Sequence, residues 1–463
     1  MGIDRRDFLK KGALASGGLL LGGLWKSAPA FGKGAGEARK IPAVLGGAQA
    51  HPASWPKWPK WKGPAWDEKL VAVLRSGVWS RANYTAQFES EWARMVGTKH
   101  CLATVNGTNA LIVALNQAGI GIGDEVIVTP YTFVASVQAI LLNGAIPVFA
   151  DIDRSTFQID PERIREKITP RTRAILPVHI LGMPADMDRI MAIAREHQLV
   201  VIEDACQAHL AEYDGRRVGS IGFAGCFSFQ NSKNVPVGEG GAIVSDDDDF
   251  MDRCYSYHNL GLPTGTQAGS LNGAFMLGTK VRFSEYQAAI GLLQMEDAVR
   301  EADLRWENGQ YLTTQLKGIK GIETVRLYPK VDRAVFHLYP FRFIREEFAG
   351  MPRDLFLRCL RAEGIPCGSG YAPLETQPFI KAAFESRLFR AVYDSATLDY
   401  EAYLEANRCP ENDLLCNEEA VWIAQNLLLT DHAAMDDIAT AVEKIRKHAD
   451  EIVKKYNPGE PRH

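Results

Sequence analysis

Short apolar runs alternate with stretches of helical spacing over residues 68–250 of the chain. The apolar runs, which are typical of buried strands, lie at 100–105, 125–129, 146–152, 174–180, 199–203, 226–229 and 241–244. The stretches with helical spacing lie at 109–118, 133–142 and 187–197. Strands that alternate with helices of roughly 10–15 residues favour βαβ units, so the pattern predicts an α/β fold with a mainly parallel sheet.

The pattern changes after a long helical stretch at 284–316. Beyond it come strand-like runs at 322–327 and 335–344, helical stretches at 351–363 and 433–453, and loop-like sequence at 366–416. We therefore expect a large domain over residues 67–317 and a smaller α+β domain over residues 318–463.

The first 30 residues read as a targeting segment. Arg5 and Arg6 precede an uncharged stretch of 14 residues, which is followed by Ala28-Pro29-Ala30. The uncharged stretch is shorter than the roughly 18 residues of a membrane-spanning helix, and the order of the three parts is that of a signal peptide. Paired arginines favour the twin-arginine route, so we expect residues 1–30 to direct export. The alternative is an uncleaved basic tail on a cytoplasmic protein.

Residues 31–66 are expected to form a linker and an N-terminal arm. The arm contains Trp55, Trp58 and Trp61, separated by prolines and lysines. A basic aromatic segment can lie on a membrane surface, but the prolines forbid a continuous amphipathic helix. We expect the tryptophans to pack the arm onto the body of the protein, with the lysines facing water.

Composition narrows the protein class only slightly. The chain has 463 residues, of which 46% are hydrophobic and 23% charged, and these values exclude disordered, collagen-like and coiled-coil classes. A net charge of −4 gives no general basic footprint for nucleic acid. The eight cysteines are too sparse for a disulfide scaffold, and no His or Cys spacing is typical of a metal site. Cys409 and Cys416 are candidates for a bridge, although free thiols are the favoured interpretation.

Candidate chemistry follows the predicted strands, because open α/β sheets bind ligands at the carboxyl ends of their strands. Gly107 and Thr108 come between a strand and a helix, where free N–H groups can bind an anion. Asp204 directly follows an apolar strand, and Gln207 lies three residues further on. A buried carboxylate at this place needs a cationic or hydrogen-bonding partner.

Lys233 lies between an aromatic strand and a glycine-rich turn at 238–241. A lysine in apolar surroundings loses basicity and becomes a usable amine nucleophile. Each of these signals alone is also compatible with an ordinary capped helix or a solvated lysine. Together, an anion pocket, an aromatic residue after a strand, a carboxylate and a lysine amine are what pyridoxal phosphate requires.

At these positions the sequence resembles the DegT/DnrJ/EryC1/StrS family of pyridoxal-phosphate aminotransferases. The motifs that carry the resemblance stand at 106–108, 123–128, 132–135, 148–151, 203–209, 228–241 and 282–290, and the likeness extends over about residues 65–450. The resemblance implies fold type I, like aspartate aminotransferase, with a mainly parallel seven-stranded sheet in the large domain.

The resemblance also implies roles for individual residues. Lys233 would form the Schiff base with the cofactor and move the proton, and Asp204 would pair with the ring nitrogen. Gln207 would contact the phenolic edge of the ring, and Phe133 would stack on its face. Gly107, Thr108 and Ser228 would hold the phosphate.

Members of this family are homodimers in which an asparagine from the partner subunit reaches the phosphate. Lys280 stands at that position here, so it is a candidate phosphate ligand in a dimer. His209 and His337 are candidates for substrate contact, with local structural roles as the alternative.

The segments at 363–371, 409–410 and 421–422 resemble most the branch that contains the 3-amino-5-hydroxybenzoate and scyllo-inosose enzymes. This branch predicts transfer of an amino group from glutamate or glutamine to a keto-sugar or keto-cyclitol. The alternatives are a non-catalytic binding or regulatory protein that keeps the cofactor fold, and a sugar dehydratase or epimerase. An exported enzyme would need an acceptor other than the nucleotide-linked sugars of the cytoplasm.

Overall fold

The structure, a computed structural model, describes residues 40–264 and 273–456. The targeting segment expected at 1–30 lies outside the described residues. Among those that are described, no helix is both long and apolar enough to cross a bilayer.

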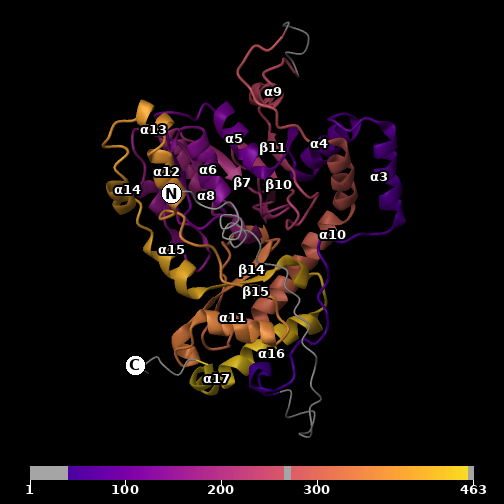
Figure 1. Cartoon of the computed structure of the whole chain (residues 1–463), viewed down its shortest axis with the longest axis vertical. Helices are drawn as coiled ribbons and strands as arrows, with labels where there is room; N and C mark the ends of the chain where they lie inside the picture. Colours follow the sequence, from indigo (N-terminus) through magenta and orange to yellow (C-terminus); the bar gives the residue numbers. More distant parts are fainter. Residues whose placement is uncertain (1–39, 265–272, 457–463) are drawn as a thin grey trace, which may run out of the picture. The chain divides into compact units, whose positions relative to one another are not determined.

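A seven-stranded sheet forms the centre of the larger part of the molecule (Figure 1). Its strand order is β1-β11-β10-β7-β6-β2-β3, and only β11 runs antiparallel to its neighbours. The expected mainly parallel sheet of a fold-type-I enzyme is therefore confirmed. The strands are β1 (His100–Thr104), β2 (Glu125–Val128), β3 (Ile146–Phe149), β6 (Thr172–Leu176), β7 (Val200–Asp204), β10 (Ala224–Ser228) and β11 (Gly241–Ser245).

Helices cover both faces of this sheet, which explains why its strands are apolar throughout. On β7, Val201 packs into one core and Ile202 into the other. The first core includes α4 (Asn83–Val96), α8 (Met187–His197) and the start of α10, and the second includes α5 (Gly107–Gln117), α6 (Val134–Leu142) and α9 (Asp248–Tyr257). The long helix expected at 284–316 is α10 (Glu285–Leu316). Helix α3 (Pro64–Ser76) packs beside it.

A second sheet follows α10 in the chain. It has four strands in the order β12-β14-β16-β15, with β12 (Ile322–Thr324), β14 (Leu338–Phe343), β15 (Cys367–Gly368) and β16 (Ala420–Ala424). Its core includes α11 (Arg353–Ala362), α16 (His432–Lys447), α17 (Ala449–Tyr456) and the end of α10. A helix of 32 residues is roughly 48 Å long, so α10 contributes to the cores of both sheets.

Four short helices occupy the stretch at 366–416, where the sequence predicted loops. They are α12 (Pro378–Phe384), α13 (Arg387–Val392), α14 (Tyr400–Ala406) and α15 (Pro410–Leu414). Each is only five to seven residues long, so helical periodicity cannot be read from its sequence. Phe384, Phe389 and Tyr403 pack into the core around α5 and α6. The segment therefore packs on the large sheet, and the domain boundary at 317/318 stays a prediction.

Smaller elements complete the described chain. Two-residue strands form the hairpin of β4 (Ile152–Asp153) and β5 (Gln158–Ile159), and β8 (Glu212–Tyr213), β9 (Arg216–Arg217) and β13 (Val331–Arg333) form a small three-stranded sheet. The remaining α-helix is α7 (Pro161–Glu166), and one-turn helices lie at Ala43–Leu45, Ile180–Gly182, Arg345–Phe348, Leu415–Glu419 and Gln425–Leu428.

Candidate active site

The residues that follow β1, β7 and β10 meet at one edge of the large sheet. A Cβ atom added to Gly107 would lie only 2.7 Å from Cβ of Ser228 and 3.0 Å from Sγ of Cys206. Glycine is required at position 107 because the start of α5 approaches the end of β10 so closely. The three strand ends are thus in direct contact at the edge where the sequence placed the site.

Asp204 ends β7 and is only 4% exposed. Its Oδ2 atom accepts a hydrogen bond of 2.7 Å from Oγ of Ser136, and its Oδ1 atom accepts one of 3.1 Å from the N–H of Cys206. Ser136 belongs to α6, so a residue from a separate helix orients the carboxyl group at the end of β7. This arrangement fixes one buried carboxyl group at the sheet edge.

Lys233 lies in the turn after β10. Its backbone N–H donates to the carbonyl of Gln230 at 2.9 Å, and its own carbonyl accepts a hydrogen bond of 3.0 Å from Nε1 of Trp58. Burial lowers the pKa of the Lys233 amine, and the nearby Cys206 and Asp204 only partly oppose that effect. A lysine of reduced basicity next to a buried carboxylate suits an amine nucleophile.

Gln207 links the large sheet to the chain beyond α11. Its Oε1 atom accepts from the N–H of Leu181 at 2.9 Å, and its Nε2 atom donates to the hydroxyl of Tyr371 at 2.7 Å. The ring of Tyr371 contacts the rings of Tyr131 and Trp422, and Nε1 of Trp422 donates to the hydroxyl of Tyr131 at 3.0 Å. These rings form an aromatic wall beside Gln207.

The start of α5 provides the candidate anion site. Asn106 caps the helix, because its Oδ1 atom accepts from the N–H of Asn109 at 2.9 Å. The N–H groups of Gly107 and Thr108 have no partner within the helix, as in the first turn of any α-helix. Ser228 lies against Gly107, so its hydroxyl adds a further donor.

Phe133 and Lys280 are the two predicted ligands that the described contacts do not join to the others. Phe133 directly precedes α6 and is 55% exposed, so its ring face is free. Its carbonyl accepts from the N–H of Ser136, the residue that holds Asp204. Lys280 is exposed and makes no ion pair with any residue in the described ranges. The stacking role of Phe133 and the phosphate contact of Lys280 remain predictions.

The two histidines are buried and structurally bonded. Nε2 of His209 is 2.8 Å from the carbonyl of Ser228, and burial together with the charge of Lys233 lowers the pKa of His209 to about 3. Nδ1 of His337 is 3.2 Å from Oδ1 of Asn234, the residue after Lys233. Burial and Lys233 also lower the pKa of His337 well below its ordinary value. Both imidazoles are therefore neutral, and they bind backbone or side-chain oxygens of Ser228 and Asn234, which flank the turn that contains Lys233.

Cys409 and Cys416 are free and buried, so the favoured interpretation as unbridged thiols agrees with the structure. Among the described residues, no group of three His, Cys, Asp or Glu side chains is arranged to hold a metal ion.

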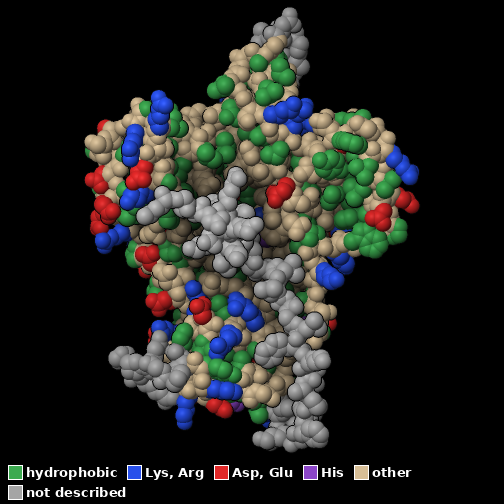
Figure 2. Space-filling model, in the orientation of Figure 1, with side chains coloured by type: hydrophobic (Ala, Val, Ile, Leu, Met, Phe, Trp, Pro, Cys, Tyr) green, Lys and Arg blue, Asp and Glu red, His purple; other side chains and the backbone are tan. Residues whose placement is uncertain are grey.

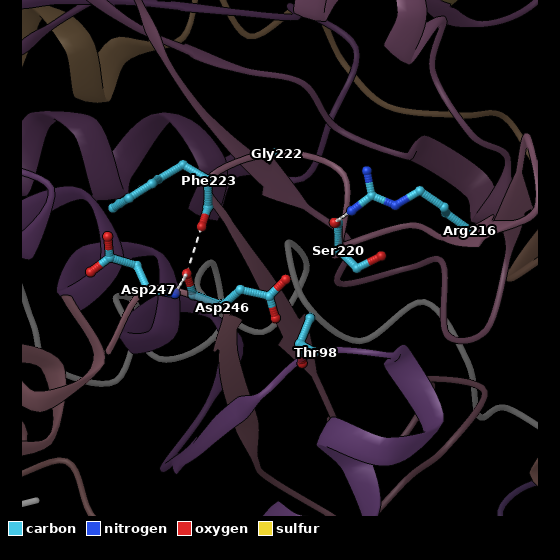
Figure 3. Close-up of a pocket in the computed structure, with 9 residues that line it drawn as sticks. Thr98, Arg216, Ser220, Gly222, Phe223, Asp246 and Asp247 are labelled. Carbon is cyan, nitrogen blue, oxygen red and sulfur yellow. Dashed lines mark hydrogen bonds between the residues drawn. The ribbon is translucent and has the colours of Figure 1, made fainter. Parts of the chain in front are cut away.

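A surface pocket of about 350 Å³ lies away from these residues (Figure 3). Gly222 and Phe223 line it and precede β10, whereas Ser228 ends that strand. Its acids have structural partners: Asp246 accepts from the N–H of Lys99, and Asp247 caps α9. The pocket is therefore at the end of β10 opposite the candidate active site.

Sequence reasoning missed three contacts: those of Ser136, Tyr371 and Trp58. Ser136 lies three residues after Phe133, which puts it on the same side of a helix start, and this spacing was an available signal. Nothing local to Tyr371 or Trp58 indicates a partner 164 or 175 residues away in the sequence.

The N-terminal arm was expected to pack onto the body of the protein through its tryptophans. This prediction is confirmed for Trp55 and Trp58 but wrong for Trp61, which is 63% exposed.

The residues at this edge fit pyridoxal phosphate. Lys233 supplies an amine, Asp204 a carboxylate for the ring nitrogen, Gln207 a polar group for the ring edge, and the start of α5 an anion site. The helix start is kept open by Gly107, where a Cβ atom would crowd Ser228.

Comparison with known proteins gives the same assignment. The family model for DegT/DnrJ/EryC1/StrS aminotransferases matches residues 63–395. The chain is 37% identical over 325 residues to the spore coat polysaccharide biosynthesis protein SpsC of Bacillus subtilis, covering 68% of this chain and 83% of that protein. It is 34% identical over 430 residues to L-glutamine:scyllo-inosose aminotransferase of Streptomyces griseus, covering 89% of this chain and 98% of that protein.

Solved structures agree with this match. The crystal structure of 3-amino-5-hydroxybenzoic acid synthase superposes with a TM-score of 0.74 at 29% identity, covering 85% of this chain and 98% of that one. An aminotransferase from Psychrobacter cryohalolentis also gives a TM-score of 0.74, at 31% identity over 86% of this chain and all of that one. The chain belongs to the DegT/DnrJ/EryC1/StrS aminotransferase family and is a pyridoxal-phosphate-dependent aminotransferase of fold type I.

Proposed function

We propose that this aminotransferase moves an amino group from glutamine or glutamate to a keto-cyclitol or keto-sugar. The observation that carries the proposal is that the buried Lys233 amine lies within the electrostatic influence of the buried Asp204 carboxyl group at one sheet edge. The scyllo-inosose aminotransferase to which the chain is similar supports the cyclitol class and glutamine as donor. The likeness to SpsC supports a sugar-related acceptor.

Pyridoxal phosphate, when bound, supplies an electron sink that stabilises negative charge on the substrate carbon. Lys233 would hold the cofactor and then carry the proton to and from that carbon. Its lowered pKa increases the fraction of neutral amine near pH 7, which is the form that accepts a proton.

Asp204 would keep the cofactor's ring nitrogen protonated, because it is a fixed and buried carboxylate. The hydrogen bond from Ser136 prevents Asp204 from rotating away. Gln207, hydrogen-bonded to Leu181 and Tyr371, would position the edge of the cofactor ring that lies away from the ring nitrogen. The aromatic wall of Tyr131, Tyr371 and Trp422 would exclude water from that side.

The test is amino transfer with defined substrates. Purified protein loaded with pyridoxal phosphate is mixed with glutamine or glutamate and with scyllo-inosose, 2-deoxy-scyllo-inosose or a keto-sugar, and the amino product is measured by mass spectrometry. We expect an amino-cyclitol or amino-sugar with the wild type and with Lys57→Ala, an exposed control. We expect no product with Lys233→Ala.

Other outcomes would reject the proposal. A product that has lost water and gained no nitrogen would indicate a dehydratase. A cofactor absorption band that no amino donor changes would indicate a binding protein without turnover. A band that is unchanged in Lys233→Ala would reject the role of this lysine.

We also propose that the active enzyme is a homodimer in which Lys280 reaches the phosphate site of the other copy. In support, Lys280 is exposed and follows Leu277, which is 90% exposed. Hydrophobic side chains also gather over α3 (Figure 2), where Val71 and Leu74 are exposed, and Trp79 is exposed three residues after the end of this helix. Equilibrium sedimentation should give twice the chain mass, and Lys280→Ala should weaken cofactor binding without changing that mass. A monomer with full activity would reject this proposal.

For the targeting segment, we propose export by the twin-arginine route. A fusion of residues 1–35 to a folded reporter should leave the cytoplasm, and Arg5→Lys with Arg6→Lys should stop it. A reporter that remains inside, or leaves equally well with both lysines, would show that the segment has another role.

A further inference from the structure

The N-terminal arm contacts the active-site lysine directly. Nε1 of Trp58 donates a hydrogen bond of 3.0 Å to the main-chain carbonyl of Lys233, a residue 175 positions later in the chain. The backbone N–H of Lys233 is bonded to Gln230 on the other side. The two bonds hold the backbone on both sides of the Cα atom of Lys233, from which the catalytic side chain extends.

The ring of Trp58 is held in place by Arg305 of α10. The guanidinium of Arg305 lies 5.1 Å from the centre of the Trp58 ring, in the range of a cation–π contact. Arg305 is only 1% exposed, and its Nε atom donates to Oε1 of Gln425 at 2.8 Å. The guanidinium also forms an ion pair with Glu301 at 3.7 Å, but its Nη2 atom has no hydrogen-bond partner among the described residues. The Trp58 ring therefore covers a buried cation that is only partly hydrogen-bonded, and this contact gives the ring a defined position.

The arm is also tied on either side of Trp58. Nδ2 of Asn426 donates to the carbonyl of Pro56 at 2.7 Å, and Nζ of Lys62 pairs with Asp297 of α10 at 2.8 Å. Three residues before Trp58, Nε1 of Trp55 donates to the carbonyl of Gly364 at 2.7 Å. The arm therefore forms a strap, residues 51–62, whose contacts run from the region of the second sheet to Lys233 and α10.

We propose that Trp58 is a positioning residue for Lys233: its indole N–H, held in place by Arg305, fixes the backbone from which the catalytic side chain extends. The inference rests on the proposed aminotransferase function. Amine transfer requires the lysine nitrogen to be held close to the substrate carbon, and a displacement of about 1 Å can lower the rate by about 100-fold. A bond to the lysine's own carbonyl restricts such displacement without touching the substrate.

The strap provides a matched pair of variants. Trp58→Phe keeps an aromatic ring over Arg305 and removes the N–H that Lys233 accepts. Trp55→Phe removes the same kind of indole N–H from a bond of similar length to a main-chain carbonyl, but that carbonyl belongs to Gly364. Both variants remove one arm hydrogen bond, so both should lower the melting temperature by similar amounts.

The first readout uses cofactor-free protein. Acetylation of Lys233 is followed against pH by peptide mass spectrometry, with exposed Lys57 as an internal reference. We expect the labelling midpoint of Lys233 to move toward that of Lys57 in Trp58→Phe, because a loosened amine is better hydrated, and to stay in place in Trp55→Phe. Asp204, Cys206, His209 and His337 are the titratable groups around this amine, and both variants leave them intact.

The second readout uses the loaded enzyme. We expect Trp58→Phe to lower kcat about tenfold with KM changed less than about twofold, and Trp55→Phe to change neither. If Trp58→Phe does not fold, benzothienylalanine at position 58 replaces the indole N–H by sulfur in a ring of nearly the same shape, and the same two readouts apply.

Equal behaviour of the Trp58 and Trp55 variants in both readouts would overturn the inference. Failure of the proposed function is distinguishable from this result. In that case the wild type would show no amino transfer, while the labelling of Lys233 in cofactor-free protein would still report on Trp58.

Discussion

Oγ of Ser136 lies 2.7 Å from Oδ2 of Asp204, and this bond joins α6 to the end of β7. It couples the helix that follows Phe133 to the carboxyl group that we expect to face the cofactor's ring nitrogen. The residue expected to stack on the cofactor ring and the carboxyl group expected to pair with it are therefore linked by one short segment of chain.

Ser136→Ala should weaken cofactor binding. The change leaves the buried Asp204 carboxylate with one hydrogen-bond donor fewer, which costs about 1–3 kcal/mol, or roughly a 5- to 150-fold rise in the Kd for pyridoxal phosphate. Fluorescence titration of the cofactor-free protein measures this. The control is Ser245→Ala, which removes a buried hydroxyl bonded at 2.7 Å to the carbonyl of Phe223, at the opposite end of β10. Equal affinity in the two variants would show that Ser136 does not act through Asp204.

Gly107→Ala should damage the anion site specifically. Its new Cβ atom would lie 2.7 Å from Cβ of Ser228, so α5 or β10 must shift, at a cost of about 1–3 kcal/mol in the free energy of unfolding. We expect inorganic phosphate and pyridoxal phosphate to bind more weakly, as measured by calorimetry. Gly121→Ala is the matched control, because the nearest atom to its Cβ would be 3.6 Å away. Unchanged phosphate binding in Gly107→Ala would contradict the assignment of the helix start.

The cofactor-free protein should become more stable as pH rises toward 10.5. Burial lowers the pKa of Lys233 below its ordinary value of 10.5, so between the folded-state pKa and 10.5 the unfolded chain binds more protons than the folded chain. The free energy of unfolding therefore increases with pH in that interval, by up to about 1.4 kcal/mol per pH unit. Lys233→Met should flatten this slope in urea unfolding, and the exposed control Lys57→Met should not. A slope that persists in Lys233→Met must come from another group.

Glu375 should produce the opposite slope at lower pH. Burial raises the pKa of this carboxyl from 4.5 to about 7, although Nδ2 of Asn412 donates to it. The folded chain then binds more protons between pH 4.5 and 7, so stability is greatest below pH 4.5 and falls by about 3 kcal/mol as pH rises through 7. Glu375→Gln should remove this fall, and the exposed control Glu385→Gln should keep it. An identical pH profile for both variants would exclude Glu375 as its source.

The positions of the site residues at the strand ends could be predicted because the sheet itself could be predicted from the sequence. Apolar runs mark strands that are buried on both faces, and the parallel arrangement puts Asp204 and Ser228 at one edge with the residues after β1. Lys233 follows β10 by five residues, which keeps it at the same edge. Sequence reasoning therefore found the residues that depend on chain direction alone.

The remaining features depend on contacts between distant segments. Gln207 is bonded to Tyr371, and Trp58 is bonded to Lys233. No pattern in the sequence around these four residues indicates that they lie close together. The four helices at 378–414 are each shorter than two full turns, so their sequences show no helical periodicity from which they could be predicted. They are stabilised by the packing of side chains such as Phe384 and Tyr403 into the core of the large sheet.

The strap at residues 51–62 lies entirely before residue 63, where the match to the family begins. A protein trimmed to the matched region would retain Lys233, Asp204 and the whole seven-stranded sheet. It would also expose the buried Arg305 and leave the carbonyl of Lys233 without its indole donor. We therefore expect the smallest catalytically competent piece of this chain to be longer than residues 63–395, the region that the family model matches.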